Sequence, residues 1–105
     1  MRIYVAGPYT KGDVVVNVRN AIFAADTLFA SGHTPYVPHL THLWHTVCPH
    51  PWNDWLRLDL AWLAQCDAVL RLPGESDGAD IEIAEAERLK IRVYLRTEDV
   101  PRGHS

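Results

Sequence analysis

Short apolar runs occur at four places along the chain and predict four strands. The runs are Ile3-Tyr4-Val5-Ala6, Thr34-Pro35-Tyr36-Val37-Pro38, Ala68 to Leu72 and Ile91 to Leu95. Continuous apolar runs of this length are typical of strands that are covered on both faces of a sheet. The prolines of the second run indicate a sheet edge or strand ends.

Helical spacing of apolar residues fills the intervals between these strands. We expect a first helix from Val14 to Ala30, with Asp13 as its N-cap. Its apolar face holds Val15, Val18, Ile22, Ala25 and Phe29. Further helices are expected from Pro51 to about Gln65 and from Ala79 to Lys90. Strands that alternate with helices predict a small doubly wound α/β domain, Rossmann- or flavodoxin-like, with a parallel sheet of four to five strands and helices on both faces.

The composition is that of one folded domain. With 105 residues, 48% hydrophobic and 22% charged, residues 1–105 are expected to form a single domain whose polar end, 97–105, is loosely held. A net charge of -3 without a basic cluster argues against a nucleic-acid partner. No apolar run approaches the ~20 residues of a membrane span. The two cysteines, Cys48 and Cys66, make no disulfide framework, which favours a cytoplasmic protein.

The most informative segment is Ser76-Asp77-Gly78-Ala79-Asp80-Ile81-Glu82, which leads from the third strand into the last long helix. Loops at the carboxyl ends of strands are where open α/β sheets bind ligands. Glu82 is expected in the first turn of this helix, where the helix dipole would keep its carboxylate ionised as a nucleophile or base. Acidic residues also favour first helical turns for structural reasons alone, so this position does not define a site by itself.

Asp59 is expected on the apolar side of the helix that begins at Pro51. It falls within the stripe formed by Trp52, Leu56, Leu63 and Cys66. A carboxylate that faces a core is costly unless it is paired, and desolvation or a neighbouring ionised carboxylate raises its pKa. Asp59 is therefore a candidate proton donor, or an orienter of a bound hydroxyl or base, beside an ionised Glu82. Pairing with Arg57 or Arg71 is the structural alternative.

Two further segments contain candidate ligand-binding residues. Gly7-Pro8-Tyr9-Thr10 follows the first strand and precedes a helix, the usual place for backbone N–H groups to bind phosphate or ribose, although it lacks dinucleotide-binding and P-loop spacings. The segment from His39 to Pro49 is expected to be irregular or short-helical. Residue types that bind zinc follow one another here, at His39, His42, His45, Cys48 and His50, but without a standard zinc spacing. A metal site in this segment is therefore an alternative and not the prediction. The tryptophans favour core packing and a subunit interface, so a homodimer or higher homo-oligomer is expected; they are Trp44, Trp52, Trp55 and Trp62.

Four segments in order resemble one enzyme family over nearly the whole chain. They are Ile3 to Tyr9, Trp55 to Leu60, Cys66 to Leu70 and Ser76 to Ala86. The family is that of the nucleoside 2-deoxyribosyltransferases, with their relatives the 2'-deoxynucleoside 5'-phosphate N-hydrolases. The resemblance implies that Glu82 attacks C1' of the sugar to give a glycosyl-enzyme, that Asp59 helps the base to leave, and that no metal or organic cofactor is needed. The substrate-binding residues it implies are Gly7, Pro8, Tyr9, Thr10, His39, Ser76 and Gly78.

Within this resemblance, Ser76 indicates which kind of substrate is bound. Transferases that act on free nucleosides usually have an Asp at this position, whereas the phosphohydrolase branch has a serine, because a carboxylate would repel a phosphate. His39 also matches that branch, whereas Gly7-Pro8-Tyr9 looks more like the transferases. We therefore expect cleavage of the N-glycosidic bond of a (deoxy)nucleoside 5'-monophosphate. Base exchange on free deoxynucleosides and a non-catalytic nucleotide-sensing module are the alternatives, and the sequence does not define the base.

Overall fold

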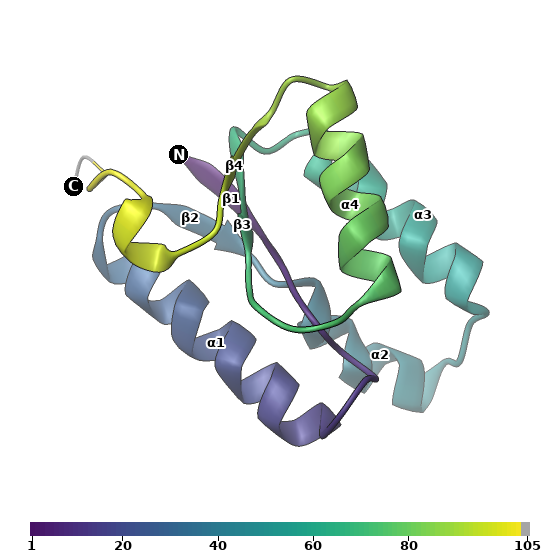
Figure 1. Ribbon diagram of the computed structural model, residues 1–105. Helices are drawn as coiled ribbons and strands as arrows, with labels where there is room; N and C mark the ends of the chain where they lie inside the picture. Colours follow the sequence, from purple (N-terminus) through teal and green to yellow (C-terminus); the bar gives the residue numbers. More distant parts are fainter. Residues whose placement is uncertain (104–105) are drawn as a thin grey trace.

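The four expected strands form one parallel sheet in the order β2-β1-β3-β4 (Figure 1). The computed structural model describes residues 1–103. The strands are β1 (Arg2–Ala6), β2 (Thr34–Tyr36), β3 (Ala68–Arg71) and β4 (Arg92–Tyr94). The helices are α1 (Val14–Ala30), α2 (Thr41–Val47), α3 (Trp52–Leu63) and α4 (Asp77–Arg88), with 3-10 turns η1 (Pro38–Leu40) and η2 (Thr97–Asp99). This arrangement is the predicted doubly wound α/β fold, with four strands among the described residues.

Alternation along β1 divides the core into two layers. Ile3 and Val5 point to the face covered by α1, where they pack against Leu28. Tyr4 and Ala6 point to the opposite face, which α3 and α4 cover (Figure 1). All four of these β1 side chains are fully buried. The sheet is therefore apolar on both faces, as the continuous apolar runs predicted.

The predicted apolar face of α1 is wrong in part. The helix turns Ala21, Ala24, Ala25 and Leu28 toward the sheet. Val15 and Phe29, expected on the buried face, are 76% and 70% exposed. Three of the four buried residues are alanines. Alanine is only weakly hydrophobic, so it adds little to the apolar periodicity of the sequence, although its short side chain lets the helix pack close to the sheet. The larger residues at helical spacing lie on a flank of α1.

Helix α4 begins earlier than predicted, and this changes the position of Glu82. Ser76 is the N-cap, with its Oγ accepting a hydrogen bond from the backbone N–H of Ala79 at 3.1 Å. Because the helix starts at Asp77, Glu82 lies in its second turn, and the prediction that it lies in the first turn is wrong. Similarly, Pro51 is the N-cap of α3 instead of its first helical residue.

The segment after β4 folds back over the C-terminal end of α1. The N–H of Gly103 donates to the carbonyl of Ser31 at 2.7 Å, and the ring Nε2 of His33 contacts the carbonyl of Pro101 at 2.6 Å. Residues 97–103 of the expected loose tail thus have defined contacts, and residues 104–105 lie outside the described residues. Within residues 1–103, no helix is both long and apolar enough to cross a membrane.

The sheet topology fixes where a ligand can bind. After β1 the chain goes to β2 on one side of it, and later enters β3 on the other side. The carboxyl ends of β1 and β3 therefore flank a topological switch point, where the loops of an open α/β sheet diverge and leave a crevice. The loop after β1 and the loop between β3 and α4 both start there.

Candidate active site

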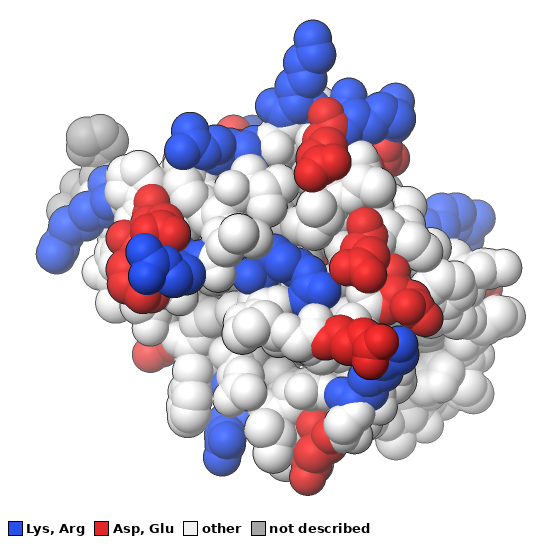
Figure 2. Space-filling model, viewed as in Figure 1, with Lys and Arg blue, Asp and Glu red and all other residues white. Residues whose placement is uncertain are grey.

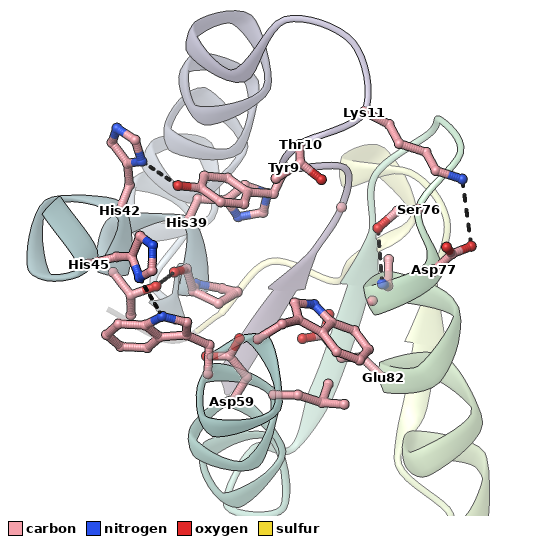
Figure 3. A pocket seen from close by; sticks show the side chains of 18 of the residues that line it. Tyr9, Thr10, Lys11, His39, His42, His45, Asp59, Ser76, Asp77 and Glu82 are labelled. Carbon is pink, nitrogen blue, oxygen red and sulfur yellow. Dashed lines mark hydrogen bonds and ion pairs between the residues drawn. The ribbon is translucent and has the colours of Figure 1, made fainter. Parts of the chain in front are cut away.

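A cavity of about 680 Å³ opens at this switch point (Figure 3). The loop after β1, the segment from η1 through α2, helix α3 and the start of α4 all contribute to its lining. Eight of the nine predicted site residues line it: Gly7, Tyr9, Thr10, His39, Asp59, Ser76, Gly78 and Glu82. Four segments of the chain thus meet around one space.

Glu82 lies at the buried end of the cavity and is hydrogen-bonded to a tyrosine. Only 6% of the residue is exposed. The hydroxyl of Tyr4, on β1, donates to Oε2 of Glu82. Burial raises the pKa of the Tyr4 hydroxyl well above its usual range, so this hydroxyl keeps its proton and acts as the donor. The strand thereby holds one oxygen of the carboxylate in a fixed position.

Burial, and not the helix dipole, dominates the electrostatics of Glu82. Desolvation raises the pKa of its carboxyl group to about 7, partly opposed by the hydrogen bond from Tyr4, and the charge of Asp59 raises it further. The expectation that the helix N-terminus holds Glu82 ionised is therefore wrong. The physical reason is its place in the second turn on the sheet-facing side, where loss of water outweighs the dipole.

Asp59 is a second carboxyl group with a raised pKa in the same cavity. Desolvation raises its pKa to about 7, as the sequence predicted for a carboxylate on the apolar stripe of α3. Its Oδ1 is buried without a hydrogen-bond partner among the described residues. The alternative pairing with Arg71 is not observed, since that guanidinium instead contacts Asp80 Oδ1 at 3.2 Å. A buried, unpaired carboxyl oxygen beside an open cavity is available to a bound molecule.

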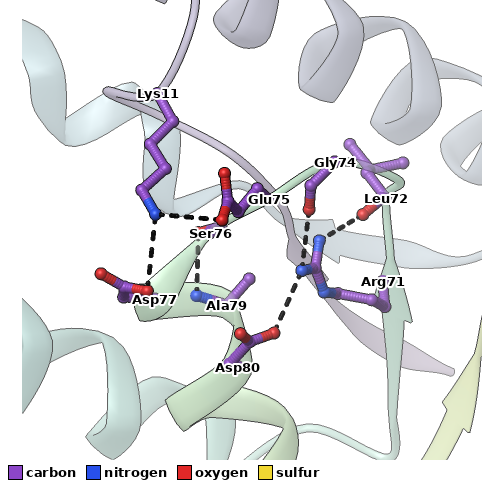
Figure 4. Close-up of polar contacts among 9 residues, drawn as sticks. All are labelled: Lys11, Arg71, Leu72, Gly74, Glu75, Ser76, Asp77, Ala79 and Asp80. Atoms are coloured by element: carbon purple, nitrogen blue, oxygen red, sulfur yellow. Dashed lines mark hydrogen bonds and ion pairs between the residues drawn. The ribbon is translucent and has the colours of Figure 1, made fainter.

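The rim above α4 contains Lys11, which sequence reasoning did not single out (Figure 4). Its Nζ lies 3.7 Å from Oε1 of Glu75 and 3.6 Å from Oδ1 of Asp77. Lys11 lines the cavity, and no other Lys or Arg of the described residues does so. Both carboxylates are more than 80% exposed, so these ion pairs are weak and an incoming anion can compete for the lysine. The only sequence signal for this role was its place in the loop after β1.

The first loop is held close to the β3–α4 loop and to His39. A Cβ added at Gly7 would come within 3.0 Å of the Leu72 side chain, so this position favours glycine. Pro8 does not line the cavity; its carbonyl accepts a hydrogen bond from Nε2 of His39 at 2.9 Å. Burial lowers the pKa of His39, so the imidazole is neutral with its proton on Nε2. Nδ1 of His39 is then an acceptor, buried without a partner among the described residues.

The opposite wall of the cavity is made by α2 and is rich in histidine (Figure 3). The hydroxyl of Tyr9 is hydrogen-bonded to Nδ1 of His42. Nδ1 of His45 accepts from the indole N–H of Trp55 at 2.8 Å. Among residues 1–103, no three His, Cys, Asp or Glu side chains are grouped so that they could hold a metal ion.

The aromatic lining differs from the sequence expectation. The tryptophans were expected in core packing and a subunit interface, but Trp52 and Trp55 line the cavity, whereas Trp44 does not. Trp44 packs edge-on against Trp55, with ring centroids 5.1 Å apart. Tyr4 was missed as well, although the alternation along β1 already separated it from Ile3 and Val5. Nothing in the sequence pairs Tyr4 with Glu82, because that contact joins residues 78 positions apart.

The fold and the cavity define an α/β protein with a cavity at the switch point of its sheet. The chain belongs to the family described as "Domain of unknown function (DUF4406)", whose model matches residues 1–95. A comparison with curated proteins finds no match. Among solved structures, the chain is similar to a 2-deoxyribosyltransferase from Bacillus psychrosaccharolyticus, with a TM-score of 0.65 and 20% identity over 89% of this chain and 69% of that one. At this identity the likeness shows the fold alone.

Proposed function

We propose that this protein breaks the N-glycosidic bond of a nucleoside 5'-monophosphate, with Glu82 as the nucleophile. The observation that carries the proposal is the pair of buried carboxyl groups, Glu82 and Asp59, in one cavity with an oriented Tyr4 hydroxyl. Two carboxyl groups at a scissile glycosidic bond supply the nucleophile and the acid that this reaction needs. The fold of a 2-deoxyribosyltransferase is consistent with this chemistry.

The two carboxyl groups have different roles because they differ in protonation state. Both pKa values are raised to about 7, and the charge on Asp59 raises that of Glu82, so near neutral pH the pair favours one proton over none or two. Tyr4 donates to Glu82, which favours the ionised form there and leaves the proton on Asp59.

The proposed reaction then balances in two steps. An oxygen of Glu82 forms a bond to C1' while the bond from C1' to the base nitrogen breaks, and the base takes that electron pair and the proton of Asp59. Water next attacks C1' and gives its proton to Asp59, and the bond between C1' and Glu82 breaks to restore the carboxylate. Every group in this sequence is a described side chain, the substrate or water.

The rim of the cavity supports a phosphate at the 5' position. Lys11 is a cation there, and the hydroxyl proton of Ser76 is free to donate, because its Oγ acts as the acceptor in the helix cap. The first backbone N–H groups of α4 add the positive end of the helix dipole. Tyr9, Trp52 and Trp55 also line the cavity and supply flat surfaces for the base.

A second candidate is base exchange on free deoxynucleosides. Glu75 and Asp77 contact Lys11 at the same rim, and these carboxylates suit a neutral 5'-hydroxyl better than a phosphate. In that reaction a second base, instead of water, attacks C1' of the intermediate. The two candidates share Glu82 and Asp59 and differ only in the 5' substituent and the acceptor.

The test is chromatographic detection of free base from a panel of deoxy- and ribonucleoside 5'-monophosphates and the matching nucleosides, each with and without a second base. We expect base release from monophosphates without an added base. Lys11→Gln should raise KM for monophosphates about tenfold, whereas Lys90→Gln, outside the cavity, should not. Turnover of free nucleosides only with an added base would favour the exchange reaction. Nucleotide binding without any cleavage would support a sensing module and overturn both enzymatic proposals.

A further inference from the structure

Arg71, the last residue of β3, has an arginine side chain that is almost withdrawn from solvent. On the face drawn in Figure 2, acidic and basic side chains are interspersed, and several basic side chains extend into solvent. The ion-paired side chains of Arg2, Arg88 and Arg96 are each more than 60% exposed, whereas that of Arg71 is 14% exposed. A guanidinium always carries its charge, so its burial is costly unless it makes several hydrogen bonds.

The guanidinium of Arg71 joins the loop between β3 and α4 to the first turn of the helix (Figure 4). Nη1 donates to the carbonyl of Leu72, and Nη2 donates to the carbonyl of Gly74 at 3.0 Å and to Oδ1 of Asp80 at 3.2 Å. One planar group thus holds two carbonyls of the loop and a carboxylate of the helix that follows it. A lysine cannot reproduce this arrangement, because its single ammonium nitrogen lacks the fixed fork of donors.

The two carbonyls belong to residues through which this loop packs on the loop after β1. The Leu72 side chain packs on Gly7, and a Cβ added at Gly74 would lie 2.7 Å from the ring of Pro8. Gly74 also has a φ of +116°, a conformation that favours glycine. Arg71 therefore holds the β3–α4 loop next to the two places where it touches the other loop of the site.

The charge of Arg71 also acts on the carboxyl group of Glu82. The ionisation of Glu82 is influenced by Tyr4 from β1, Asp59 from α3 and Arg71 from β3. Burial and the charge on Asp59 raise the pKa of Glu82, whereas the hydrogen bond from Tyr4 and the positive charge of Arg71 lower it. Arg71 does not line the cavity, so its influence on a bound molecule is indirect.

We propose that Arg71 is a positioning residue of this site: its guanidinium fixes the β3–α4 loop and the start of α4, and its charge favours the ionised form of Glu82. The electrostatic part is effective because two charges interact more strongly away from water than in it. The kinetic consequences rest on the proposed function, in which ionised Glu82 attacks C1'. The order of the loop and the ionisation of Glu82 are measurable without any turnover.

Three substitutions separate the two roles of Arg71. Arg71→Lys keeps the charge and loses the fork of donors, and Arg71→Gln loses both. Arg88→Gln is the matched control, because it removes an arginine that is ion-paired with Glu85 on the same helix but is 69% exposed.

The first measurement is hydrogen exchange of the loop amides in residues 72–80. Both Arg71 variants should exchange there about tenfold faster than wild type, whereas Arg88→Gln should not. The second is the pH dependence of urea unfolding, with Glu82→Gln added in each background to isolate the titration of Glu82. The midpoint of that titration should rise by about 0.5 in pH in Arg71→Gln and stay at the wild-type value in Arg71→Lys.

Base release supplies the kinetic readout. Both Arg71 variants should lower kcat about tenfold, because a displaced loop misplaces the attacking group. The acid limb of the profile of kcat against pH should move to higher pH in Arg71→Gln, and Arg71→Lys should restore it. A purely structural role of Arg71 would lower activity in both variants and leave the limb where it is.

A second variant keeps the electrostatic role testable if Arg71→Gln does not fold. Asp80→Asn leaves the carbonyl contacts of Arg71 in place and removes the carboxylate that faces its charge. The midpoint for Glu82 should then fall, and by more than in Asp77→Asn, which removes a similarly exposed carboxylate of the same helical turn.

Two results would overturn the inference. Loop exchange that Arg71→Lys leaves unchanged would remove the positioning role, and a Glu82 titration that neither Arg71→Gln nor Asp80→Asn shifts would remove the electrostatic role. Failure of the proposed function is distinguishable from both. In that case wild type releases no base, while the exchange and titration results still follow the expectations for Arg71.

Discussion

The two sides of the cavity are built in opposite ways. On one side, Tyr4, Asp59 and Glu82 come from a central strand and two long helices, and burial sets the ionisation of both carboxyl groups. On the other side, His42 and His45 come from a short helix without a buried residue. We call these the carboxyl floor and the histidine wall.

The difference indicates where chemistry and recognition can reside. Large pKa shifts require desolvation, so groups that move protons or attack the substrate belong to the floor. Side chains near solvent on a marginal element can contact a ligand and adjust to it, but they cannot hold a reacting atom tightly. Substitutions on the floor should therefore change kcat and the pH profile, and substitutions on the wall should change KM.

The largest effect is expected for Glu82→Gln. The amide has the same shape and still accepts from Tyr4, but it cannot attack C1', so kcat should fall by about 10⁴-fold or more. The measurement is base release under saturating substrate. Glu87→Gln, an exposed position on the same helix, is the control and should keep wild-type activity. Equal activity of the two variants would remove Glu82 from the mechanism.

Asp59→Asn should reduce kcat by about 10²- to 10⁴-fold, because the asparagine cannot give a proton to the leaving base. Activity requires Glu82 ionised and Asp59 protonated, and both pKa values are raised to about 7. The wild-type profile of kcat against pH should therefore be bell-shaped with its maximum near 7. The variant should lose the alkaline limb and keep the acid limb. An unchanged alkaline limb would assign the proton to another group.

The burial of Glu82 should also make the stability of the folded protein depend on pH. Because the pKa of Glu82 is about 7 in the folded state and near 4.5 when unfolded, the folded state holds the proton more tightly. The contribution of this proton to the free energy of unfolding is complete below about pH 4.5 and is lost as pH rises to 7. In urea titrations, Glu82→Gln should therefore gain up to about 3 kcal/mol relative to wild type between these pH values. A constant difference between the two proteins would show that Glu82 is not desolvated.

Tyr4→Phe should reduce kcat about tenfold at pH 7. The hydrogen bond from Tyr4 lowers the pKa of Glu82, so its removal raises that pKa and protonates the nucleophile. The acid limb of the pH profile should shift to higher pH, a result that a purely structural defect would not produce. Tyr36→Phe is the matched control, since Tyr36 packs on Tyr4 through its ring, with centroids 5.6 Å apart.

The smallest effect is expected on the histidine wall. His45→Ala removes the acceptor for the indole N–H of Trp55, and loss of one such hydrogen bond costs about 1 kcal/mol. KM should rise about fivefold while kcat stays within about twofold of wild type. Thr46→Ala, exposed on the same helix, should leave both constants unchanged. A large fall in kcat for His45→Ala would break the distinction between wall and floor.

The fold could be predicted from the sequence because the patterns that indicate it are local. Continuous apolar runs defined the strands, and the spacing around Asp59 already indicated a carboxylate on an apolar face that must be desolvated. The buried face of α1 was not accessible, because its three alanines give a weak apolar signal beside larger residues such as Phe29. Hydrophobic size and burial do not coincide on that helix.

The parts of the site that sequence could not define are all tertiary. The hydrogen bond from Tyr4 to Glu82 joins a strand to a helix at opposite ends of the chain, and no local pattern encodes it. The raised pKa of Glu82 depends on its burial on the sheet-facing side of α4, which only the packing of the helix on the sheet defines.

The most direct test of the account is the mass of the Glu82 peptide during turnover. Acid-quenched reactions with a deoxynucleoside 5'-monophosphate are digested, and the peptide that contains Glu82 is examined for a gain equal to the sugar phosphate residue. The account predicts this adduct on Glu82 in wild type and its absence in Glu82→Gln. Base release with an adduct on another residue, or with no adduct on Glu82 at any quench time in wild type, would contradict it.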